Sequence, residues 1–159
     1  MIKFFKKLFG IKETSGNCCG GADSCCTGGG AELFSAEDKK VLANIDPNIV
    51  IGKILEIKAH PDPSVTRVQI TKCDFGGGET AQILCGGVNI AEGAFVPVAK
   101  VGTKFSETFA INEREIRGEK SCGMICSRDE LGLSAGGDHE IWILPATAEK
   151  SLGTSLRDL

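Results

Sequence analysis

One short segment, residues 117–133, gathers residue types that could contact a nucleic acid. Three cations, Arg117, Lys120 and Arg128, surround a Ser-Cys-Gly-Met turn. Guanidinium and ammonium groups bind phosphate oxygens, a serine hydroxyl bonds phosphate or a ribose 2′-hydroxyl, and a flexible thioether packs on an exposed base. The pattern also fits a solvated face, because acidic residues alternate with these cations: Glu115, Glu119 and Asp129.

Four cysteines near the N-terminus form a second group, Cys18, Cys19, Cys25 and Cys26, in a Gly/Ser/Cys-rich linker predicted over 13–34. Four thiolates on a flexible, disordered tail could bind zinc or another soft metal such as Cu(I). Their spacing is not that of a Cys-x-x-Cys knuckle, and ligands adjacent in sequence strain a tetrahedron. Redox-active thiols on a tether are the equally open alternative, and we expect no other cofactor.

The first residues, 1–12, place apolar side chains at helical spacing with lysines on the other side. This amphipathic basic segment predicts either weak contact with an anionic membrane surface or a small docking helix. It lacks the separate apolar run of a signal peptide, so we expect a cytoplasmic protein. A net charge of -3 and a pI near 5.5 argue against strong, indiscriminate nucleic-acid binding.

The elements that must position these residues follow the linker. Ser35 is a predicted N-cap for a helix over 35–46, which Pro47 cannot continue. From there β-branched residues alternate with polar ones between glycine turns, and Gly52 predicts a bulge or bend. Several short strands of this kind predict a small closed β-barrel. The predicted strands are 49–57, 65–74, 80–85, 95–101, 109–116 and 140–144.

Five blocks of the sequence carry a family resemblance: GKILEIKAHP at 52–61, Arg67-Val68, QILCGGVN at 82–89, GAFVPVAKVG at 93–102 and IRGEKSCGMICSRDELGL at 116–133. Through these blocks, residues from about 50 onward resemble the tRNA-binding domain family, an OB-fold module found in phenylalanyl-tRNA synthetase beta subunits, methionyl-tRNA synthetases and stand-alone proteins. The sequence departs from the family pattern at 62–66, and at Gly87 and Val88, where Ala-Pro is usual. The resemblance implies an all-β, five-stranded OB-fold barrel over 47–159.

The resemblance also implies which residues contact RNA. Ser121 and Met124 match the pair associated with tRNA contact in stand-alone members, while Arg67 and Lys72 fall on or near the open face that OB-folds use. Asn89 either bonds the local backbone or faces a ligand. His60, before a proline, indicates a turn rather than an acid–base group. Cys85 and Cys126 match core positions. The complete predicted RNA-binding set is Arg67, Lys72, Asn89, Arg117, Lys120, Ser121, Met124, Ser127 and Arg128.

The resemblance therefore implies a non-catalytic tRNA-binding protein, similar to the domain in the phenylalanyl-tRNA synthetase beta subunit. The sequence contains no ATP-binding motif, which agrees with a protein that is not an enzyme. The expected partners are tRNA and either a synthetase or another protein, and we expect a monomer. Two alternatives stay open. One is a protein-interaction or chaperone-type OB-fold module, and the other is a metal or redox carrier acting through the cysteine tail.

Overall fold

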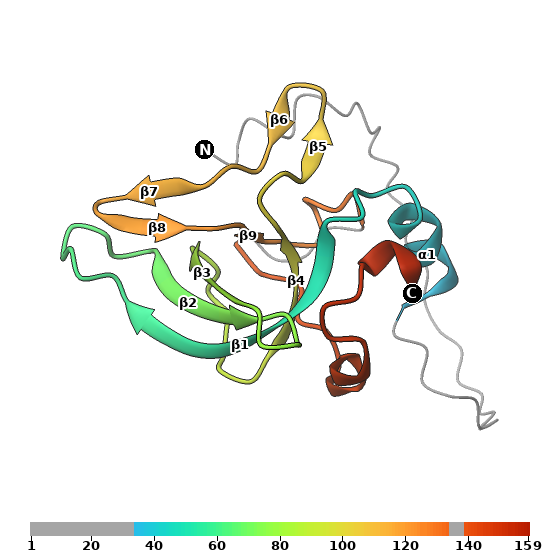
Figure 1. The fold of residues 1–159 in the computed structure, drawn as a ribbon, viewed down its shortest axis with the longest axis horizontal. Coiled ribbons are helices and arrows are strands. Elements are labelled where there is room, and N and C mark those ends of the chain that lie inside the picture. The colour runs from blue at the N-terminus through green and yellow to red at the C-terminus, as the bar shows by residue number, and fades with distance from the viewer. Residues whose placement is uncertain (1–33, 134–138) are drawn as a thin grey trace, which may run out of the picture. The chain divides into compact units, whose positions relative to one another are not determined.

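A computed structural model of the chain describes residues 34–133 and 139–159. Within these ranges a short α-helix precedes nine short β-strands and two 3-10 helices (Figure 1). The amphipathic segment predicted at 1–12, and the predicted metal ligands Cys18, Cys19, Cys25 and Cys26, lie outside the described residues. Among the described helices, none has the length and apolar character needed to cross a membrane.

The largest sheet is antiparallel and has the strand order β3-β2-β1-β4-β9, which confirms the predicted five-stranded barrel. β1 is long enough to pair with two strands: its first half pairs with β4 and its second half with β2. The strands are β1 (Ile49–Ala59), β2 (Gln69–Asp74), β3 (Thr80–Cys85), β4 (Phe95–Ala99) and β9 (Met124–Ile125).

Gly52 is required by packing rather than by a bulge. A Cβ at this position would lie 3.0 Å from Val98 Cγ2 and 3.2 Å from the Phe75 ring, so hydrogen alone fits without displacing the core. The register shift in β1 occurs between Ile54 and Glu56 instead. The bulge predicted at Gly52 is therefore wrong in position, and the glycine marks a close approach of the strand to its neighbours.

A hairpin closes the open side of the barrel, and its strands are β7 (Arg114–Ile116) and β8 (Glu119–Ser121). Four hydrogen bonds tie it and the adjoining Cys122 to β3, and two of them run from the Gln82 amide to the Glu119 carboxylate and the Lys120 carbonyl. The Cys122 backbone N–H donates to Gln82 O at 2.8 Å, and the Leu84 N–H donates to the Ser121 hydroxyl at 3.0 Å. These bonds satisfy part of the exposed edge of β3, which would otherwise present unpaired backbone groups.

The single strand predicted over 109–116 is wrong, because the chain turns inward in its middle. Ile111 is buried, its N–H donates to Thr103 O, and its carbonyl accepts from Gly102 N–H. The residues before it form β6 (Phe109–Ala110), which pairs with β5 (Lys104–Ser106), and the residues after it form β7. Each half of the predicted strand therefore belongs to a different two-stranded sheet.

The strand predicted over 140–144 is also wrong, and a side chain explains why. The Asn89 amide pairs with the backbone of Ile141 in both directions, accepting from its N–H at 2.8 Å and donating to its carbonyl at 2.9 Å. Those groups cannot then join a ladder. Only Leu144 keeps an isolated bridge, to Phe95.

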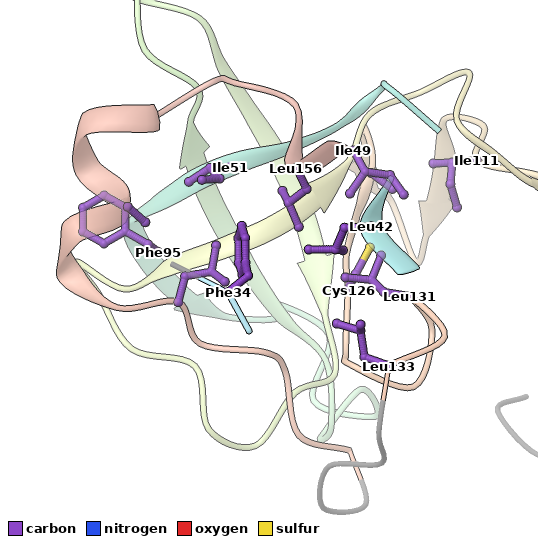
Figure 2. Packing of buried hydrophobic residues seen from close by; sticks show 13 residues of the cluster. Phe34, Leu42, Ile49, Ile51, Phe95, Ile111, Cys126, Leu131, Leu133 and Leu156 are labelled. Carbon is purple, nitrogen blue, oxygen red and sulfur yellow. The ribbon is translucent and has the colours of Figure 1, made fainter. Parts of the chain in front are cut away.

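The N-terminal helix α1 (Ala36–Leu42) begins where capping predicts, because the Ser35 hydroxyl accepts from Asp38 N–H at 3.1 Å. It ends at Leu42, a few residues before the predicted end. Phe34 and Leu42 are buried and extend the barrel core outward (Figure 2). The C-terminal 3-10 helices η2 (Ala146–Ser151) and η3 (Leu156–Asp158) add Ala148 and Leu156 to the same cluster.

Candidate nucleic-acid interface

The tip of the β7–β8 hairpin presents a cation to solvent. Arg117 and Gly118 form its two-residue turn with φ values of 51° and 88°. Positive φ at both positions is the geometry of a type I′ turn, whose twist matches the paired strands, and glycine adopts it without steric cost. Arg117 is exposed at this tip, so its guanidinium is open to solvent.

A second cation comes from the neighbouring loop, residues 60–68, which joins β1 to β2. Figure 1 shows this β1–β2 loop beside the hairpin turn, and Arg67 near its end is exposed. The two segments are tied by His60, whose Nε2 lies 3.0 Å from Ile116 O, directly before Arg117. We call the β1–β2 loop and the β7–β8 hairpin together the two-loop face.

The β1–β2 loop is stiffened by its own turn. The Asp62 carboxylate accepts from the Ser64 N–H at 2.8 Å and from the Ser64 hydroxyl at 2.6 Å. These two hydrogen bonds hold the pKa of Asp62 below its usual range, and nearby His60 acts in the same direction. The carboxylate is therefore ionised, and it accepts hydrogen bonds from within its own loop. These bonds hold the turn that precedes Arg67 in the chain.

Lys72 lies on the outer face of the sheet, at the centre of a row of polar side chains. It pairs across the strands with Glu56 of β1 and Gln82 of β3. These residues line an open hollow of about 310 Å³, and Lys72 itself is exposed. The hollow is open to solvent, and the exposed Lys72 amine can contact a ligand lying across the sheet.

Lys120 on β8 is exposed and forms an ion pair with Glu113, with 3.2 Å between Nζ and Oε1. The hydrogen bond to Glu113, together with the attraction of its charge, raises the pKa of Lys120. Because both side chains are more than half exposed, the pair holds the lysine weakly. Lys120 can therefore exchange this carboxylate for a phosphate.

Ser121 and Met124, the pair that the resemblance associates with tRNA contact, are both at least half covered by the protein. Ser121 is buried, and its hydroxyl accepts from Leu84 N–H while donating to Gly123 O at 3.1 Å. Met124 is half-buried on β9, pairs with Ala99 of β4 and packs against the core. Both residues close the barrel, so this geometry favours a structural role over direct contact with RNA.

Asn89 and Ser127 are likewise engaged with the protein. Asn89 holds the backbone of Ile141, as described above. The Ser127 hydroxyl donates to the Glu130 carboxylate at 3.1 Å and accepts from the Glu130 N–H at 3.3 Å, which caps the turn that follows. Burial raises the pKa of Glu130, against the opposing effect of the bonds from Ser127.

Arg128 supports the N-terminal helix. Its guanidinium donates to the Asp38 carboxylate at 2.9 Å and lies 4.7 Å from the centre of the Trp142 ring. Both charged side chains are largely covered, with 26% and 17% of their area exposed. Trp142 in turn packs on Phe34, 5.3 Å between ring centres. The structure thus separates Arg128 from Arg117 and Lys120, with which it shares a sequence motif.

The cysteines of the barrel belong to the core. Cys73, Cys85 and Cys126 are buried and free, which confirms the prediction for the last two, and Cys122 is half-buried. Burial raises the pKa of the Cys73 thiol to about 11, and it also raises the pKa of Cys85 and of Cys126. In the part of the chain that the structure describes, no group of three or more His, Cys, Asp or Glu could hold a metal ion. Metal binding by the tail stays a prediction.

Two residues that contribute to this end of the barrel have contacts that sequence reasoning missed. His60 was predicted to make a turn, which it does by accepting from the Asp62 N–H at 3.0 Å, but its bond to Ile116 spans 56 residues. Gln82 donates to both Glu119 and the Lys120 carbonyl at 2.9 Å. The sequence carries no local signal for either long-range contact.

Comparison with known proteins places this barrel among RNA-associated modules. The chain is similar to the phenylalanine–tRNA ligase beta subunits of Chlorobaculum tepidum (46% identical over 99 residues, 60% of this chain and 12% of that one) and Bacteroides thetaiotaomicron (40% over 123 residues, 75% and 14%). That of Neisseria meningitidis serogroup A is 36% identical over 125 residues (79% and 15%). The chain thus spans about an eighth to a seventh of the length of these curated relatives.

Two solved structures are also similar. One is a methionyl-tRNA synthetase-related protein from Pyrococcus horikoshii, with a TM-score of 0.47 and 15% identity over 79% of this chain and 98% of that one. The other is the C-terminal domain of Plasmodium vivax p43, with a TM-score of 0.39 and 24% identity over 49% and 44%. A family model described as a putative tRNA binding domain matches residues 49–154. The chain therefore belongs to the tRNA-binding domain family.

Proposed function

We propose that this protein binds tRNA, without catalysis, through the two-loop face. The observation that carries the proposal is the joining of two exposed arginines, Arg67 and Arg117, to one end of a barrel of this family by the His60 bond. Lys120 and Lys72 extend the cationic surface along the hairpin and the sheet. Guanidinium groups on rigid supports suit phosphate contact, since less conformational freedom is lost on binding.

The net charge of the domain requires that RNA be bound by a small patch of cations and not by the whole surface. Residues 34–159 contain 14 Lys or Arg and 18 Asp or Glu, so the domain as a whole repels RNA. Attraction must therefore come from a small number of well-placed cations. We expect modest affinity, with a salt dependence that corresponds to a few phosphate contacts.

The aromatic residues support recognition of folded RNA by shape and phosphate contact. The chain has no tyrosine, and its single tryptophan, Trp142, lies between Phe34 and Arg128. Phe75 and Phe95 are buried, and Phe105 packs on Phe109. Stacking of successive bases on aromatic side chains, which single-strand binders use, has no platform among the described residues.

The wider role is part of the proposal. The matched family model describes a binding domain, and this chain spans a small fraction of ligase beta subunits, so we propose capture or presentation of tRNA rather than aminoacylation. A synthetase or another protein would then act on the bound tRNA. We further propose a monomer that works in the cytoplasm, with residues 1–12 available for weak contact with a membrane surface.

Titration of total deacylated tRNA against the purified protein at two salt concentrations, with duplex DNA as competitor, tests this function. Saturable binding that weakens steeply with salt and resists DNA is the expected result. Absence of binding at low salt would contradict it. Tight binding to unfolded polypeptide, undiminished by excess tRNA, would instead favour the protein-interaction alternative.

Metal binding by Cys18, Cys19, Cys25 and Cys26 is a separate proposal that rests on the sequence alone. Four thiolates within nine residues can supply all the ligands of one soft ion. Elemental analysis of protein purified without chelators tests it. The expected result is bound metal that is lost when the four cysteines are changed to serine, and metal-free wild-type protein would contradict the proposal.

A further inference from the structure

We infer that His60 is a positioning residue for RNA binding: its side chain fixes the β7–β8 hairpin against the β1–β2 loop, so that Arg117 and Arg67 engage one RNA together. The effect on RNA binding rests on the proposed function, whereas the contact between His60 and the hairpin does not depend on it. In this role the buried His60 side chain holds two loops together, and it neither transfers a proton nor only stabilises a turn.

Both ring nitrogens of His60 are occupied, and their roles are determined by the partners. The Asp62 backbone N–H lies 3.0 Å from Nδ1 and can only donate, so Nδ1 accepts and carries no proton. In the neutral ring the proton is then on Nε2, which donates to the Ile116 carbonyl at 3.0 Å. The residue is 7% exposed, so water competes little for either bond.

The location of the Nε2 bond explains why it should matter. Ile116 is the last residue of β7 and directly precedes Arg117. Among the described strands β7 pairs only with β8, and the bonds from β3 reach the hairpin and the residue after it at 119–122, all on the far side of its turn. The His60 bond is thus a contact from the residue that follows β1 to the outer strand of the hairpin. Figure 1 shows the hairpin turn beside the β1–β2 loop, where this bond joins them.

Binding of one RNA by two separate loops gains from a fixed spacing. If the hairpin moves freely, each encounter must restore the relative position of Arg117 and Arg67, and affinity falls by the fraction of time spent in other positions. Loss of the bond should therefore lower affinity and also lower the number of phosphates contacted at once. If His60 served only the turn at Asp62, its loss would leave the hairpin in place. The position of Arg117, and with it the affinity and the number of phosphates contacted, would then be unaffected by movement of the hairpin.

Two substitutions separate the bonds. In His60→Asn the amide oxygen can occupy the position of Nδ1 and keep the Asp62 turn, whereas the side chain is too short to reach Ile116. In His60→Gln the amide nitrogen extends about as far as Nε2 and can donate to the Ile116 carbonyl. The matched control is His139→Asn, since His139 is exposed and has φ 62°, a conformation that asparagine tolerates.

Each protein is titrated with deacylated tRNA over a series of salt concentrations, and amide hydrogen exchange of residues 114–121 is followed in the free protein. For His60→Asn we expect faster exchange in the hairpin, about a tenfold loss of affinity, and a salt slope lower by about 0.7 to 0.9, the contribution of one phosphate. His60→Gln should stay near the wild type in all three quantities, and His139→Asn should equal it.

Wild-type affinity and salt slope in His60→Asn would overturn the inference, and so would equal losses in the two His60 variants. The outcome is separable from the proposed function. If the wild-type protein itself does not bind tRNA, the proposed function fails. The exchange rates of residues 114–121 then still decide whether His60 holds the hairpin, and unchanged rates in His60→Asn would overturn that part too.

Discussion

The hairpin half (residues 114–121) and the helix-facing half (residues 127–133) are separated by only five residues in sequence, but their charged side chains lie in different environments. Arg117 in the hairpin half is exposed at a turn, and Lys120 holds one weak, exposed ion pair. Arg128 in the helix-facing half is largely covered by Asp38 and Trp142. Two arginines of one motif therefore have opposite environments, one open to a ligand and one built into the fold.

The difference shows that one sequence motif can place some of its cations in solvent and use another to hold the fold together. The helix-facing half contacts α1 through the ion pair between Arg128 and Asp38. The hydrogen bonds between Ser127 and Glu130 fix the turn that contains Arg128. The bonds that fix the hairpin half to His60 and β3 use backbone groups together with the Glu119 and Ser121 side chains, and none of them uses the Arg117 guanidinium or the Lys120 amine. Substitutions in the two halves should therefore affect different measurements.

Arg128→Gln should have the largest effect on stability. It leaves the partly covered Asp38 carboxylate without its guanidinium and removes the contact with Trp142, which together should lower the free energy of unfolding by about 2 kcal/mol. Urea denaturation measures this loss. The control is Arg157→Gln, whose ion pair is exposed, and it should change stability by less than about 0.5 kcal/mol. Equal changes in the free energy of unfolding for the two substitutions would contradict a structural role for Arg128.

Arg117→Gln should act on binding instead. Loss of one guanidinium–phosphate contact should weaken tRNA binding about tenfold, which is 1.4 kcal/mol, and lower the salt slope by nearly one unit. Stability should be unchanged because the turn backbone, not the side chain, shapes the hairpin. Salt-dependent titration and urea denaturation provide both values. A large loss of stability with unchanged affinity would reverse the assignment of the two halves.

Ser121→Ala tests whether Ser121, a predicted contact residue, acts in the fold or in binding. The substitution leaves the Leu84 N–H without its acceptor in a buried position, so the free energy of unfolding should fall by about 1 kcal/mol. tRNA affinity, measured where the variant is fully folded, should stay within about twofold of the wild type. Ser106→Ala on the exposed strand β5 is the control and should be neutral. Weaker binding at unchanged stability would restore Ser121 as a contact.

Glu130→Gln should change how stability depends on pH. The pKa of Glu130 is raised in the folded state, so its stabilising contribution is full below its ordinary pKa of 4.5 and is lost as pH rises through the raised value. The stability of the variant relative to the wild type should therefore increase from about pH 4.5 toward 7. Urea denaturation across this range measures it, with exposed Glu107→Gln as control. A constant difference between the two proteins would contradict the expected titration.

Much of the barrel follows from local sequence. The strand at 80–85 has its predicted bounds, because alternation between glycine turns specifies it fully. The capping by Ser35 is equally local. The failures arise from distant partners. Asn89 takes the backbone groups of Ile141, 52 residues away, and prevents the strand predicted there.

The same distinction explains the predicted site. Exposed cations at a turn, such as Arg117, can be recognised because a polar turn between strands lies on the surface. The environment of Arg128 could not be recognised, since Asp38 is 90 residues away in sequence. His60 illustrates both cases: the turn before its proline was predictable, and its bond to Ile116 was not.

The most direct test of the division between the two halves is tRNA affinity of the wild type, Arg117→Gln and Arg128→Gln at two salt concentrations, at a temperature where all three are folded. The account predicts that Arg117→Gln binds about tenfold more weakly with a lower salt slope, while Arg128→Gln binds like the wild type. Weaker binding by Arg128→Gln with unchanged binding by Arg117→Gln would contradict it.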